Sequence, residues 1–175
     1  MTIIYVLIAG FAVLLIFISQ QPDDFVVTRS APISAPAAGI FPHVNNLHNW
    51  QAWSPWSKLD PNAKSTFEGA TEGVGAILRW DSNSNKVGKG SMEIIESRPS
   101  EYIKLKLIFI KPMSATNNSE FNFRANGDQT IVTWSMSGKN SFVGKAMNLI
   151  MDCDTMVGDQ FEKGLSDLKK VAENK

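Results

Sequence analysis

The sequence predicts an α+β fold in which a curved antiparallel sheet of about seven strands wraps around one long C-terminal helix. Across residues 65–137, short segments with alternating apolar and polar residues are separated by turn residues, as in an antiparallel meander. Across residues 141–172, apolar residues recur every three or four positions, which is the period of one helix face. Because only this helix is long enough to cover the apolar face of the sheet, we expect the sheet to grip it.

The apolar stripe of the predicted C-terminal helix leaves most charged residues on its opposite face. The stripe consists of Phe142, Ala146, Leu149, Ile150, Cys153, Val157, Phe161, Leu165, Leu168 and Val171. Gly144, Gly158 and Gly164 interrupt the helix, and each costs roughly 1 kcal/mol relative to alanine. These glycines indicate a close backbone approach or a local bend, unless they are surface glycines that the helix tolerates.

An apolar run without charge, residues 3–18, lies at the start of the chain. At helical rise it spans roughly 24 Å, and the polar residues beside it extend it toward a hydrocarbon core of ~30 Å. No Lys or Arg precedes the run, and residues 19–21 form a poor cleavage site for a signal peptide. We therefore expect a transmembrane anchor over residues 1–21 and a single-pass membrane protein. Its folded domain, residues 22–175, is expected on the extracytoplasmic side.

The sequence of the first part of the domain predicts one strand followed by two short helices. Residues 25–30 have the composition of a strand. Ser34 is expected to cap a helix that begins near Pro36, because a hydroxyl before a first-turn proline satisfies free amides. A second short helix is predicted over residues 47–53, and Pro55 ends it.

Three tryptophans in this part of the chain are spaced three residues apart. Trp50, Trp53 and Trp56 therefore project to roughly one side of a helical or 3₁₀ segment. They either fill the core or form the rim of a cavity mouth, where indole is favoured because one end is apolar and the other wet.

The remaining strands are predicted from alternation and from the turn residues between them. Residues 102–110 give the clearest half-buried strand, because Ile103, Leu105, Leu107 and Phe109 alternate with lysines. Residues 125–128 are expected to form a hairpin turn. The other predicted strands are residues 65–69, 75–82 and 87–98, one around Phe121 and Phe123, and one around Val132, Trp134 and Met136.

Length, charge and cysteine content restrict the class of protein. A chain of 175 residues is long enough for one domain with its own core. Its 17 basic and 17 acidic residues give no basic excess, so we do not expect nucleic acid as a partner. Cys153 is the single cysteine, which excludes a disulfide within the chain.

The order of these elements resembles the helix-grip superfamily of START-like lipid-transfer domains and birch-pollen-allergen-like proteins. In particular, the chain is similar to membrane-anchored members of the polyketide cyclase/dehydrase and lipid-transport family. The stretches that carry the similarity are residues 29–36, 41–42, 44–47, 50–56, 88–92, 134–136, 151–152 and 161–165. The resemblance covers about residues 25–172 and implies a cavity between sheet and helix for a hydrophobic small molecule. It implies no catalytic motif that matches positions here, and a fold alone does not give a function.

Side chains suited to catalysis or metal binding are few. His43 and His48 do not have the spacing of a zinc site, and we expect neither a metal nor a cofactor. Cys153 lies between Asp152 and Asp154, whose charges would raise the pKa of its thiol, so a buried apolar role is expected for it. Two aspartates two positions apart on a helix point in different directions, so at most one faces a cavity.

The leading hypothesis is a membrane-anchored module that holds a hydrophobic or amphipathic ligand between sheet and helix. The residues predicted to contact the ligand are Trp50, Trp53, Trp56, Trp80, Met92, Ile94, Leu105, Leu107, Phe121, Phe123, Trp134, Met136, Leu149, Cys153 and Met156. Each of them is also a suitable core residue. One alternative is a cyclase or dehydrase that uses His48, Tyr102 or Asp152 with a bound water. Another is a cavity-free subunit that binds an unidentified protein partner.

Overall fold

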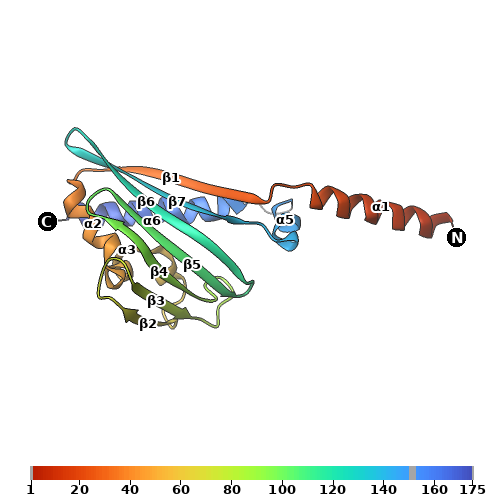
Figure 1. Cartoon of the computed structure of the whole chain (residues 1–175), viewed down its shortest axis with the longest axis horizontal. Helices are drawn as coiled ribbons and strands as arrows, with labels where there is room; N and C mark the ends of the chain where they lie inside the picture. Colours follow the sequence, from red (N-terminus) through yellow and green to blue (C-terminus); the bar gives the residue numbers. More distant parts are fainter. Residues whose placement is uncertain (1, 150–152, 175) are drawn as a thin grey trace.

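The computed structural model describes residues 2–149 and 153–174, and a seven-stranded antiparallel sheet forms its centre (Figure 1). The strand order is β1-β7-β6-β5-β4-β3-β2, so β2 to β7 follow one another as a meander and β1 joins beside β7. The strands are β1 (Asp24–Ile33), β2 (Lys64–Gly69), β3 (Ala76–Asp81), β4 (Lys89–Arg98), β5 (Tyr102–Lys111), β6 (Ala115–Asn126) and β7 (Gln129–Lys139). The predicted α+β fold with seven antiparallel strands is thus confirmed.

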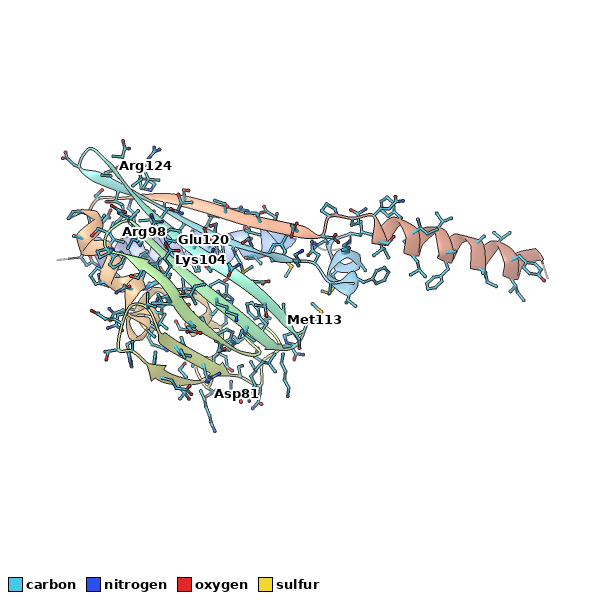
Figure 2. All side chains as sticks on the ribbon, in the orientation of Figure 1. Asp81, Arg98, Lys104, Met113, Glu120 and Arg124 are labelled. Carbon is cyan, nitrogen blue, oxygen red and sulfur yellow. The ribbon has the colours of Figure 1, made fainter. Side chains whose placement is uncertain are left out.

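The two faces of the sheet differ as the alternation predicts. On β5, Ile103 and Leu105 are completely buried on the inner face, whereas Lys104 points to the outer face. There its ammonium lies 3.0 Å from a carboxylate oxygen of Glu120 on β6, and Figure 2 shows the two side chains next to each other. The outer face is therefore solvated, and the inner face is available for the core.

Four short helical segments follow β1, where two were expected. They are α2 (Ala37–Asn45), the 3₁₀ turn η1 (Leu47–Asn49), α3 (Trp50–Trp53) and α4 (Pro55–Leu59). Pro55 begins α4, because its fixed φ suits a first helical turn, and it also ends the preceding helix. The predicted cap by Ser34 is wrong: Pro36 is the N-cap of α2, and the Ser34 hydroxyl accepts a hydrogen bond from Gln129 at 3.2 Å.

The C-terminal helix is not the single rod that the sequence predicted. It consists of α5 (Phe142–Asn148) and α6 (Cys153–Glu173), and the expected stripe residue Ile150 lies outside the described residues. Ser141 caps α5 by accepting a hydrogen bond from the Gly144 amide at 3.1 Å. The apolar side chains of α5 are largely solvent-exposed, so of these two helices it is α6 that packs on the inner face of the sheet.

Helix α6 packs against β1 and β7 on one side and against the short helices on the other (Figure 1). Its Phe161, Leu165 and Leu168 are buried in the common core. A Cβ atom at Gly164 would lie 2.7 Å from the ring of Trp134, and one at Gly158 would overlap the guanidinium of Arg29. For Gly158 and Gly164 the explanation is therefore close approach to the sheet, whereas a Cβ at Gly144 would meet only ordinary contacts at 3.5 Å or more.

Helix α1 (Thr2–Ser19) extends away from the sheet (Figure 1). It meets the rest of the chain near α5, where the buried ammonium of Lys145 donates to the Ser19 carbonyl at 3.1 Å and pairs with Asp23. Most of its large apolar side chains are exposed.

The predicted membrane anchor is not supported. Within residues 2–149 and 153–174, the structure contains no helix with both the length and the apolar character needed to cross a bilayer. The 18 residues of α1 correspond to about 27 Å at helical rise, which is less than a hydrocarbon core of ~30 Å. This finding contradicts the expected single-pass membrane location and with it the expected extracytoplasmic side.

Candidate ligand cavity

A cavity of about 330 Å³ lies between the inner face of the sheet and the helices α3, α4 and α6. Strands β2 to β7 supply one wall, and the helices supply the other. The lining residues are Trp50, Gln51, Ser54, Trp56, Ser57, Asp60, Pro61, Ala63, Ser65, Leu78, Trp80, Asn85, Lys86, Val87, Met92, Leu107, Phe109, Lys111, Pro112, Ser119, Trp134, Met136, Val157 and Phe161. Most of these side chains are apolar, and the charged ones lie in connections (Asp60 and Lys86) or at the end of a strand (Lys111).

A stack of aromatic rings forms the inner end of the cavity. Trp134 lies parallel to Phe161 of α6, with ring centroids 4.1 Å apart and planes inclined by 10°. Phe121 lies close to the same indole at 4.8 Å, and Trp56 meets it edge to face at 5.6 Å. Such ring pairs contribute about 0.5–1.5 kcal/mol each beyond the area they bury. This end of the cavity is therefore rigid.

Two polar groups occur within this aromatic wall. The Ser119 hydroxyl accepts a hydrogen bond from the Trp134 indole at 2.8 Å and donates its only proton to the Ser135 carbonyl at 3.2 Å. The indole N–H of Trp56 has no acceptor among the described residues, although those of Trp50, Trp80 and Trp134 all have one. Trp56 thus provides a hydrogen-bond donor that the protein itself does not satisfy.

Three connections surround the mouth of the cavity. They contribute Asp60 and Pro61 between α4 and β2, Lys86 between β3 and β4, and Lys111 with Pro112 at the end of β5. The Asp60 carboxylate accepts hydrogen bonds from the Asn62 amide at 2.9 Å and from the Ser82 hydroxyl. The mouth is consequently polar, in contrast to the interior.

Seven of the fifteen residues predicted to contact a ligand lie on the cavity wall: Trp50, Trp56, Trp80, Met92, Leu107, Trp134 and Met136. They come from α3, α4 and the four strands β3, β4, β5 and β7, and the fold brings them together around one space. Their contact with a ligand remains a prediction.

The other eight predicted residues do not line the cavity. Five are buried in the core beside it: Trp53, Ile94, Leu105, Phe121 and Phe123. Leu149 and Met156 are 42% and 51% exposed, because the chain divides into two helices where one continuous stripe was expected. The side chain of Cys153 lies outside the described residues.

The residues considered for an enzyme mechanism lie away from the cavity or outside the described part. His48 is exposed and stacks on Phe67, with ring centroids 3.7 Å apart. Burial, followed by the charge of Glu120, raises the pKa of Tyr102 to about 12, and this phenol is not part of the cavity wall. Asp152 is not among the described residues, and Asp154 is exposed and pairs with Arg29.

Several lining residues were not predicted. Leu78 and Phe109 share the inner face with Trp80 and Leu107, so the period of two along β3 and β5 contained the signal for them. Lys86 and Lys111 lie in or next to connections, where no period indicates which way a side chain points. The position of these two lysines on the cavity wall was therefore not predictable from the sequence.

Comparison with known families and structures agrees with this fold. The family model described as polyketide cyclase/dehydrase and lipid transport matches residues 24–173. No curated protein matches the sequence.

Three solved structures illustrate the similarity. The Aha1 dimer from Colwellia psychrerythraea is 14% identical with a TM-score of 0.61, and the match covers 86% of this chain and 97% of that one. Protein CV1439 from Chromobacterium violaceum is 11% identical with a TM-score of 0.62, and the match covers 86% and 98%. DynU16, from the dynemicin biosynthetic locus, is 14% identical with a TM-score of 0.61, and the match covers 87% and 48%. At these identities, the similarity concerns the fold alone.

Proposed function

The chain belongs to the polyketide cyclase/dehydrase and lipid transport family, and from this premise we propose that its cavity binds a hydrophobic or amphipathic small molecule. The observation that carries the proposal is the cavity itself. Its volume of about 330 Å³ falls in the range of ~300–1,000 Å³ that is usual for small-molecule pockets. A cavity-free interaction subunit, the third hypothesis from the sequence, does not agree with this volume.

The chemistry of the wall supports an apolar ligand. Met92 and Met136 contribute thioether side chains, which adapt to the shape of an apolar guest. The indoles of Trp56 and Trp134 present large apolar surfaces, and the N–H of Trp56 is able to orient a ligand oxygen. A ligand with an extended apolar part and few polar atoms fits this wall best.

The direct test is to purify the full-length chain, extract it with organic solvent and analyse the extract by mass spectrometry. A fluorescent fatty acid is then titrated into the extracted protein. We expect either a co-purified hydrophobic molecule or saturable binding at one site per chain. A protein that is empty and binds no such probe would contradict the proposal.

A pair of variants separates binding in the cavity from adsorption to exposed apolar surface, including that of α1. Leu107→Trp places an indole in the cavity, whereas Ile108→Trp places the same indole on the outer face of β5, where Ile108 is 38% exposed. We expect at least about tenfold weaker probe binding for Leu107→Trp and unchanged binding for Ile108→Trp. Overpacking costs about 1–3 kcal/mol of stability, so thermal melts must show that both variants are folded. Equal binding by the two variants would exclude the cavity as the site.

A further inference from the structure

We infer that the ligand of this cavity carries an anionic headgroup, which Lys86 and Lys111 hold at the mouth. The inference rests on the proposed function and specifies the class of ligand. Both lysines line the cavity, one from the β3–β4 connection and one from the end of β5. Both are exposed, whereas Trp134 and Phe161 of the aromatic stack are buried.

The ammonium groups of Lys86 and Lys111 are available to a ligand. Neither forms an ion pair within the described part of the chain. The neighbouring Lys89 differs, because its ammonium lies 2.5 Å from a carboxylate oxygen of Asp81. Lysine is a flexible point charge that keeps its apolar stem on the cavity rim and its head in water, as contact with an exposed anionic group requires.

The acidic groups near the mouth do not cancel this positive charge. Asp60 is the only described carboxylate on the cavity wall, and its two oxygens accept hydrogen bonds from the Asn62 amide and the Ser82 hydroxyl. Asp81 is held by Lys89, whose hydrogen bond keeps the pKa of this carboxyl below its usual value. The charge of Lys111 also lowers the pKa of Asp81, but neither Lys86 nor Lys111 forms an ion pair among the described residues, and the one carboxylate on the wall is already engaged.

The deeper wall contains no charged group among the described residues. Its polar members are the buried Ser119 and Ser54, and the remainder is apolar or aromatic. The cavity therefore suits an amphiphile whose apolar tail lies along the deeper wall and whose polar head lies at the mouth. An anionic head at the mouth is attracted by the lysines, a neutral head gains nothing from them, and a cationic head is repelled.

The experiment compares ligands that share one chain length and differ in headgroup. Decanoate, decyl phosphate, decanol and decylamine are titrated into the full-length protein, with displacement of a neutral fluorescent probe as the readout. We expect one or both anions to bind about three- to tenfold more tightly than decanol at low salt, since each exposed ion pair contributes ~0.2–1 kcal/mol. Comparing the two anions shows whether a fatty-acid-like or a phosphate-like head is preferred. The preference should shrink at high ionic strength.

Two double variants identify the source of the preference. K86Q/K111Q removes both mouth charges and should abolish the preference for anions without weakening decanol binding. K106Q/K163Q removes the same charge from exposed lysines of β5 and α6 that do not line the cavity, and it should retain the preference. Equal affinity for all heads, or a preference that survives K86Q/K111Q, overturns the inference but leaves the proposed function standing. If none of the four ligands displaces the probe, the proposed function fails as well.

Discussion

Gly164 shows how one residue determines the distance between α6 and the sheet. The residue is buried, and a Cβ there would lie 2.7 Å from Trp134 and 3.1 Å from Pro55. Trp134 cannot move away easily, because it is 2% exposed, stacks on Phe161 and donates a hydrogen bond to Ser119. The absence of a side chain at Gly164 therefore allows the helix to approach the aromatic stack.

The prediction at this scale is that Gly164→Ala destabilises the domain by about 1–3 kcal/mol, although alanine is the better helix former by ~1 kcal/mol. Gly144→Ala is the matched control in α5, where an added Cβ meets only ordinary contacts at 3.5 Å or more. We expect the control to be neutral or slightly stabilising. Urea denaturation of both variants measures the difference, and a Gly164→Ala protein as stable as the control would refute this account of the packing.

At the scale of elements, an ion pair connects α4 to α6, two of the helices that border the cavity. The Lys58 ammonium of α4 lies 2.6 Å from one Asp167 oxygen, and Lys170 lies 2.8 Å from the other. Hydrogen bonds from Lys170 and then Lys58 keep the pKa of Asp167 below its ordinary value of 3.8. The charged form of Asp167 is therefore favoured by folding, and this interaction stabilises the position of α4.

This arrangement predicts a dependence of stability on pH. Because the pKa of Asp167 is lower in the folded state, its contribution is fully present above pH ~4 and is lost as pH falls through the lowered value. Asp167→Asn should lower the free energy of unfolding by up to about 1 kcal/mol at pH 7. At a pH low enough to protonate Asp167 in the wild type, the substitution should leave the free energy of unfolding unchanged. Asp159→Asn, at an exposed position of the same helix, is the control and should have little effect at either pH. Denaturation curves at several pH values test this, and a cost for Asp167→Asn that is independent of pH would contradict it.

The elements also show what could be predicted from the sequence. All seven strands were predicted, the first from its composition and the clearest of the others from alternation, which indicates a sheet with one buried face, as Leu105 and Lys104 illustrate. The division of the C-terminal helix was missed, because the apolar stripe continues through Leu149 although that side chain is 42% exposed. Periodicity identifies an amphipathic face but not whether tertiary structure covers it.

The candidate site was predicted less completely than the fold. Inward positions on strands supplied Trp80, Leu107 and Trp134, yet alternation alone does not distinguish a cavity wall from the solid core that contains Leu105. The charged mouth depends on how the connections between strands fold. No pattern in the sequence predicted that Lys86 and Lys111 line the same cavity.

At the scale of the whole molecule, α1 is a separate extension of the domain. Of its described side chains only Ile18 is buried, and few polar contacts, such as that of Lys145 with the Ser19 carbonyl, tie it to α5. The sheet begins after it, at Asp24. The division of the chain at residues 21 and 22 remains a prediction, which truncation tests.

A chain that contains residues 22–175 should keep its fold and lose only a few degrees in its melting temperature. The physical reason is that α1 buries little apolar surface against the remainder, so its removal takes away little stabilisation. Circular dichroism and thermal melting of both chains provide the measurement, and ligand affinity in the shorter chain serves as the control for an intact cavity. A truncated chain that fails to fold would show that α1 belongs to the domain.

The pairing of β1 with β7 has a consequence for the synthesis of the protein. Roughly 100 residues separate the two strands, so at about 5–20 residues per second β1 leaves the ribosome some 5–20 s before its partner exists. During that interval its backbone amides and carbonyls have no native neighbour, and the meander that follows is free to assemble first. The nascent chain thus carries an unpaired strand near its beginning until translation is almost complete.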